Sequence, residues 1–99
     1  MAKYERRFQG NFDAVLSRLH EGILNGSASA SFEEGSDFSA GEVRCAVRVY
    51  ERYSLSGGNR LSLTLTLLAK EKDLFLSPIA AGGSQGVFFT LNTWSEACF

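Results

Sequence analysis

Hydrophobic and polar positions alternate most regularly between Val43 and Ala69, and this alternation predicts one long β-hairpin. Successive side chains of a strand point to opposite faces, so each arm has two distinct faces. The odd positions of the first arm are mostly apolar: Val43, Cys45, Val47, Val49, Glu51, Tyr53 and Leu55. Its even positions, which include three arginines, are Arg44, Ala46, Arg48, Tyr50, Arg52 and Ser54. In the second arm, Leu61, Leu63, Leu65 and Leu67 alternate with Ser62, Thr64, Thr66 and Leu68.

The turn between the arms decides which faces combine. A two-residue loop at Gly57-Gly58 pairs Leu55 with Arg60, whereas a loop with an odd number of residues pairs Leu55 with Leu61. A slip of one residue moves every side chain to the other face, so we prefer the odd loop, which joins the apolar faces. This register predicts a core built by the odd positions and arginines on the outer face. It also places Glu51 on the apolar face, at the edge of the core or in a salt bridge.

A helix is predicted between Asn11 and Gly26. Asn11 is a favourable N-cap, and the carboxylate of Asp13 suits the first turn of a helix. Apolar residues recur along one helical stripe, formed by Phe12, Val15, Leu16, Leu19 and Ile23. We expect Asn25-Gly26 to end the helix with a residue in the left-handed conformation.

Shorter alternating segments surround these two elements. Residues 3–9 predict a first strand and residues 27–33 a second, followed by a polar connection over residues 33–42. After the charged turn at residues 70–73, a further strand pairs Leu68 with Phe75 on the outer face. Pro78 is expected to restrict that strand to an edge or to end its pairing.

The C-terminal part predicts one more strand and one more helix. Residues 87–91 are apolar, and Thr93 to Glu96 match a capping box that starts a helix at Trp94. The sequence stops at Phe99 after about one helical turn, so we expect this helix to be truncated. The predicted order β-α-β-β-β-β-β-α indicates a single α+β domain over residues 1–99, with a curved antiparallel sheet and helices packed on one face.

Composition narrows the class of function. Hydrophobic residues make up 44% and charged residues 21% of the 99 residues, as in ordinary globular proteins. A net charge of −1 does not favour binding to nucleic acid or to an anionic membrane. No apolar run is long enough for a transmembrane helix, and two cysteines make no disulfide framework, so we expect a cytoplasmic protein.

Candidate catalytic chemistry is weak. His20 could pair with Cys45 as base and nucleophile, but a lone cysteine on an apolar face is more often a small buried hydrophobe. One histidine and two distant cysteines lack the spacing of a metal site, and no cofactor motif is present. The sequence therefore predicts a protein that is not an enzyme and that uses no metal or cofactor.

Two binding surfaces are predicted instead. The first would hold an apolar small molecule between sheet and helices, with a glycine-rich rim, and comprises Tyr53, Gly82, Gly83, Ser84, Gln85 and Trp94. The second is an outer face for self-association or for another protein, and comprises Arg44, Arg48, Tyr50, Arg52, Leu68 and Phe75. A homodimer and an apolar small molecule are therefore the candidate partners.

The segments FQGNFDAVLSRLHEGILNGSASASFEEGSDF and VRCAVRVYERYSLSGGNRLSLTLTL, with GGSQGVFF and NTW, resemble a family of short bacterial proteins of unknown function. The resemblance covers most of the chain and implies no catalytic motif. It also implies a longer C-terminal helix beyond position 99. The element order is similar to the helix-grip arrangement of START-like ligand-binding domains, an analogy of fold alone.

Overall fold

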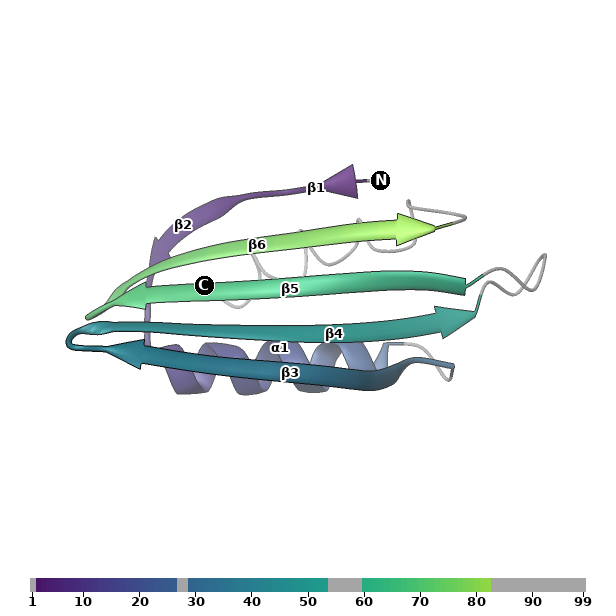
Figure 1. The fold of residues 1–99 in the computed structure, drawn as a ribbon, viewed down its shortest axis with the longest axis horizontal. Coiled ribbons are helices and arrows are strands. Elements are labelled where there is room, and N and C mark those ends of the chain that lie inside the picture. Colours follow the sequence, from purple (N-terminus) through teal and green to yellow (C-terminus); the bar gives the residue numbers. More distant parts are fainter. Residues whose placement is uncertain (1, 27–28, 54–59, 83–99) are drawn as a thin grey trace.

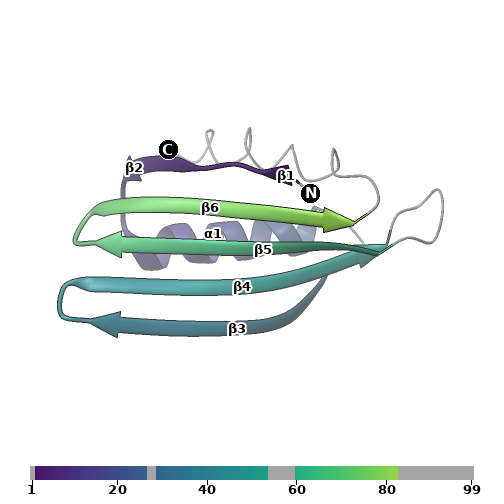
Figure 2. The same ribbon diagram turned by 45° about the horizontal axis from the view of Figure 1, so that its top comes forward.

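A computed structural model describes residues 2–26, 29–53 and 60–82, and these form the predicted α+β fold (Figure 1). The elements are β1 (Ala2–Lys3), β2 (Arg6–Gln9), α1 (Phe12–Asn25), β3 (Ser31–Ala40), β4 (Val43–Tyr53), β5 (Arg60–Lys70) and β6 (Asp73–Gly82). Neighbouring strands are antiparallel in the order β1-β6-β5-β4-β3, and β2 also pairs with β6. Since β1 and β2 occupy one position in succession, β5 is the middle of five positions (Figure 2).

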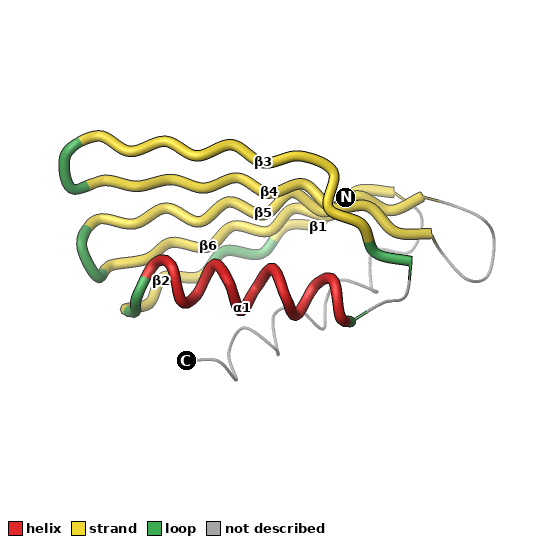
Figure 3. Tube along the Cα trace, turned by 90° about the horizontal axis from the view of Figure 1, so that it is seen from below, coloured by secondary structure: helices red, strands yellow, loops and turns green. Residues whose placement is uncertain are grey.

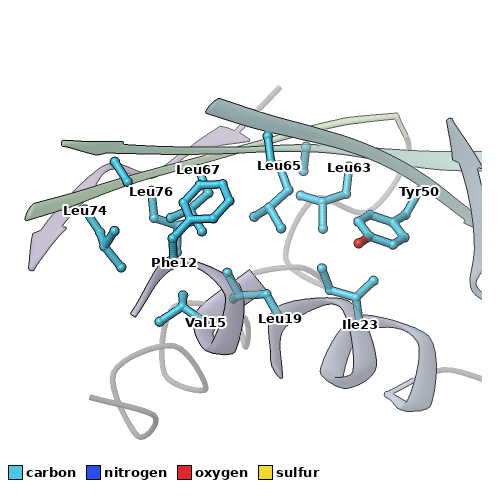
Figure 4. Packing of buried hydrophobic residues seen from close by; sticks show 13 residues of the cluster. Phe12, Val15, Leu19, Ile23, Tyr50, Leu63, Leu65, Leu67, Leu74 and Leu76 are labelled. Atoms are coloured by element: carbon cyan, nitrogen blue, oxygen red, sulfur yellow. The ribbon is translucent and has the colours of Figure 1, made fainter. Parts of the chain in front are cut away.

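Helix α1 lies along one face of the sheet, which we call the inner face (Figure 3). The core fills the space between them (Figure 4), and its most deeply buried side chains include Leu19 of α1 and Leu65 and Leu67 of β5, all at 0% exposure. The odd leucines of β5 therefore face α1, as the strict alternation predicted. The opposite face of the sheet is called the outer face.

The helix follows its sequence signals closely. Asn11 caps the first turn, since its side-chain oxygen accepts a hydrogen bond from the backbone N–H of Ala14 at 2.9 Å. The stripe points inward, with Phe12, Val15, Leu19 and Ile23 buried. The expected left-handed end was wrong: Gly26 has φ −78° and continues the right-handed turn, and its N–H donates to the carbonyl of Gly22.

The β5–β6 register is the predicted one. Leu68 lies opposite Phe75 on the outer face, and Leu67 lies opposite Leu76 on the inner face. The restriction expected from Pro78 was wrong, because β6 continues through it to Gly82 in an interior position. Pro78 is tolerated there because its backbone faces the break between β1 and β2, where its carbonyl accepts from the N–H of Tyr4 at 3.1 Å.

The preferred β4–β5 register was wrong: the observed pairing is shifted by an odd number of residues, which exchanges the two faces of β4. Tyr53 pairs with Arg60 and Tyr50 with Leu63, so the even positions of β4 share the inner face with the leucines. Ala46 and Tyr50 are buried at 0% and 1% exposure, whereas Val47 and Val49 are only partly buried on the outer face. The choice failed because it treated every arginine as a marker of the wet face, although long arginine side chains can cross apolar surface and keep their charged ends in water.

The second strand and the polar connection were also predicted wrongly. Strand β3 starts at Ser31 and runs through the whole polar stretch to Ala40, with a bulge between Phe32 and Glu34. A polar sequence suits this position, because β3 is an edge strand and is largely exposed. Glu51 forms the expected salt bridge, with Arg60, but it lies opposite Ser62 on the outer face.

Some predicted elements lie outside the described residues. These are the loop at Gly57 to Asn59, the strand over residues 87–91 and the helix starting at Trp94. None of the helices within residues 2–26, 29–53 and 60–82 has the length and apolar character needed to cross a membrane.

Candidate functional site

An apolar row crosses the outer face of the sheet from strand to strand. Phe38 pairs with Cys45, Cys45 with Leu68, and Leu68 with Phe75. Phe38 is 66% exposed and Leu68 is 40% exposed, while Cys45 and Phe75 are partly buried. Four apolar side chains in neighbouring strands therefore lie on the face turned away from the core.

Charges flank the apolar centre of the outer face at the sheet edges. Arg7 of β2 pairs with Phe75 and so ends the apolar row on a positive charge. A parallel row runs from Glu34 through Val49, Thr64 and Ile79 to Lys3, and so ends on opposite charges. The Lys3 ammonium also lies 3.8 Å from the carboxylate of Glu5, with both side chains exposed. The outer face thus carries Lys3 and Arg7 along β1 and β2, with Glu5 beside Lys3, and Glu34 on β3, whose carboxylate accepts a hydrogen bond from the backbone N–H of Gly35 at 2.9 Å.

On the inner side, an aromatic cluster joins α1 to the sheet. The imidazole Nδ1 of His20 lies 2.7 Å from the hydroxyl oxygen of Tyr50. The ring of Phe32 meets the His20 ring edge-on at 5.4 Å and the Tyr50 ring at 5.8 Å between centroids. Burial raises the pKa of Tyr50 to about 12, against a smaller opposing effect of the Arg48 charge. Tyr50 is therefore a neutral phenol at physiological pH.

An open groove lies beside this cluster, between α1 and β3. We call it the α1–β3 groove, and its lining is Leu16, Ser17, His20, Phe32, Glu34, Gly35, Asp37 and Arg48. Gly35 lets the side chains of Arg48 and Phe32 pack closely against the backbone of β3. A Cβ at this position would lie only 3.1–3.2 Å from their atoms. Phe32 is 45% exposed and forms an apolar part of this surface.

Two arginines of the inner face are held by acidic residues. Arg44 donates two hydrogen bonds to Asp13 at 2.9 and 3.0 Å and lies over the Phe12 ring at 4.2 Å. The hydrogen bond from Arg44 lowers the pKa of Asp13 and raises that of Arg44. Arg48 donates to Asp37 at 3.0 Å. These pairs explain how arginines occupy the same sheet face as the core.

The structure divides the predicted interaction face between the two sides of the sheet. Leu68 and Phe75 lie on the outer face, as expected. The other members, Arg44, Arg48, Tyr50 and Arg52, lie on the inner face, because they share the register parity of the buried Tyr50. The predicted set is therefore not one surface, and Cys45 and Phe38 take the places that were assigned to the arginines.

Only part of the predicted ligand site can be placed. Tyr53 ends β4 and is 52% exposed, and Gly82 ends β6 at the same end of the sheet, where β5 begins. Gly82 has φ +112° and lies so close to β5 that a Cβ would meet the carbonyl oxygen of Arg60 at 2.4 Å. The other members, Gly83, Ser84, Gln85 and Trp94, lie outside the described residues.

A Cys45–His20 catalytic pair does not form. Cys45 lies on the outer face, paired with Leu68, whereas His20 projects from α1 on the inner side toward Tyr50. The sequence reasoning missed the His20–Tyr50 contact and the two members of the apolar row on β3 and β4, Phe38 and Cys45. Ala46 and Tyr50 are apolar residues at the even positions of β4, which also carry the arginines. They were the signal in the sequence that favoured the observed register.

Comparison with known proteins gives a family and a fold. The profile of a family of unknown function (DUF6054) matches residues 1–99, and no curated protein matches the sequence. The fold is similar to that of PA94 from Pseudomonas aeruginosa, a protein of unknown function whose name suggests a regulator. The TM-score is 0.58 at 9% identity, over 99% of this chain and 81% of that one, so the similarity concerns the fold alone. By the match along its whole length, the chain belongs to the family of unknown function DUF6054.

Proposed function

We propose that this chain is a protein-interaction domain that works without catalysis, and that the outer face of its sheet is the binding surface. The observation that carries the proposal is the apolar row of Phe38, Cys45, Leu68 and Phe75, which runs across β3, β4, β5 and β6. Within the described part of the chain, the one helix lies on the other side of the sheet (Figure 3).

The outer face is the side of the sheet that is turned away from α1 (Figure 3). An antiparallel sheet with one solvated face usually carries polar side chains there. In this chain that face carries Phe38 on β3, Leu68 on β5 and Phe75 on β6, with Phe38 66% and Leu68 40% exposed. Covering them with another protein surface removes apolar area from water, which favours binding by roughly 25 cal/mol for each Å² of apolar surface buried.

Site-specific photo-crosslinking in cells that produce this protein tests the proposal. Benzoylphenylalanine replaces Phe75 in one strain and Arg18, an exposed residue of α1, in a matched control. We expect irradiation to give protein adducts from position 75 and not from position 18. Absence of adducts from position 75, in cells that accumulate the folded protein, contradicts the proposal.

A second candidate function is binding of a flat, uncharged small molecule in the α1–β3 groove. The half-exposed ring of Phe32 above Gly35 favours it, because a flat ligand could stack there without displacing the leucine core. The test is a panel of uncharged aromatic compounds in a fluorescence binding assay. Ser17→Trp should fill the groove and abolish binding, whereas Arg18→Trp, one position along the helix and outside the lining, should not. Equal binding by both variants argues against this site.

A further inference from the structure

The arrangement of side chains on the outer face is self-complementary. We infer that the partner of this face is a second copy of the chain, related by a two-fold axis that runs along β5 between two face-to-face sheets. The inference rests on the proposed function of the outer face. It specifies both the occupant and its orientation, and both follow from the order of residues within the rows.

Because β5 is the middle of five strand positions, a two-fold axis along it places β4 of one copy over β6 of the other, and β3 over β1 and β2. Each row then meets the same row in reversed order. In the apolar row, Leu68 faces the partner's Leu68, and Cys45 faces the partner's Phe75. In these two rows, the uncharged residues of β4, β5 and β6 of one copy thus cover those of the other.

The ends of the two rows are also complementary in this arrangement. Reversal of the apolar row brings Phe38 of one copy to Arg7 of the other, a guanidinium against an aromatic ring. Reversal of the parallel row brings Glu34 to the partner's Lys3, a pair of opposite charges. Each contact occurs twice in the dimer, as in any isologous interface.

Two other arrangements bring like charges together. A two-fold axis that crosses β1 and β2 near Glu5 sets Lys3 against the partner's Arg7 and Glu5 against the partner's Glu5. Pairing through the exposed edge of β3 sets two strands side by side that each carry Glu33, Glu34 and Asp37. Like charges oppose both arrangements, and acidic side chains on an edge strand commonly prevent such pairing. Electrostatics therefore selects the axis along β5.

Sedimentation equilibrium and a charge swap test the occupant and the charged contacts. We expect the full chain to sediment as a dimer. Lys3→Glu should weaken dimerisation at least tenfold, because it sets a second carboxylate against that of Glu34, and the double variant Lys3→Glu/Glu34→Lys should restore it. Circular dichroism confirms that each variant is folded. A wild-type chain that stays monomeric at millimolar concentration overturns the inference, and so does a double variant that is no better than the single one.

Crosslinking tests the orientation. In a Cys98→Ser background, Phe75→Cys provides a thiol that should face the native Cys45 of the other copy, so a short bismaleimide should link the dimer efficiently. Adding Cys45→Ala should abolish the link. A dimer that forms without this link overturns the arrangement and leaves the proposed function standing. Cellular adducts from position 75 to a different protein, with none to a second copy, overturn the second copy as partner but likewise support an interaction at this face.

Discussion

His20 of α1 and Tyr50 of β4 meet at 2.7 Å through the imidazole Nδ1 and the phenol oxygen, and this contact joins the helix to the sheet at the edge of the core. Tyr50 is 1% exposed, so its hydroxyl depends on this partner in place of water. The same contact places the even side chains of β4 on the inner face. Four predictions test this arrangement.

Removing the Tyr50 hydroxyl should destabilise the fold modestly. Tyr50→Phe keeps the ring in the core but removes the hydrogen-bond partner of His20, so we expect a loss of about 1 kcal/mol in the free energy of unfolding. Urea denaturation provides the measurement. Tyr53→Phe, at a 52% exposed position, should have little effect. A larger loss at position 53 than at position 50 would contradict the register of β4.

Alkaline pH should weaken the fold through Tyr50. Its pKa is raised from 10.0 to about 12, so the folded state holds this proton more tightly than the unfolded state does. The associated stability is complete below about pH 10 and should be lost between pH 10 and 12, up to about 2–3 kcal/mol. Phenolate absorbance should show one of the three tyrosines titrating late. Tyr50→Phe should remove that late phase, and its persistence would assign it to another tyrosine.

Acid should weaken the contact between α1 and β4. Arg44 lowers the pKa of Asp13 below 3.8, so the stability linked to this carboxylate is present above that pH and is lost as pH falls through the lowered pKa. The difference in unfolding free energy between the wild type and Asp13→Asn should therefore shrink as pH falls below about 4. Arg44→Gln should reduce the same pH dependence. A difference that does not change with pH would show that the Asp13–Arg44 pair contributes nothing to the pH dependence of stability.

Neighbouring leucines of β5 should respond very differently to truncation. Leu67 is fully buried against α1, and Leu68 is 40% exposed on the outer face. We expect Leu67→Ala to cost about 2–5 kcal/mol, because it leaves a cavity in the core. Leu68→Ala should cost the isolated chain less than about 1 kcal/mol. Thermal unfolding at low protein concentration compares them, and similar losses would contradict the assignment of faces.

The sequence by itself determined the helix and one of the central registers. Asn11 and the apolar stripe located α1, because capping and helical spacing are properties of short segments. The short charged turn located the β5–β6 pairing, including Leu68 opposite Phe75, since few residues separate the strands and both apolar patterns agree. The family resemblance also agreed with the family match.

Only the tertiary structure decided which face of β4 is buried. The two parities differ by one residue in the connection between β4 and β5, and the pattern of β4 alone favoured the wrong one, since its odd positions are the more apolar. Distant residues reversed that preference: Asp13 and Asp37 hold Arg44 and Arg48, and His20 satisfies Tyr50. The candidate binding surface changed with it, because the arginines turned inward and Phe38 and Cys45 took their place on the outer face. Such partners lie far away in sequence, so local alternation carries no information about them.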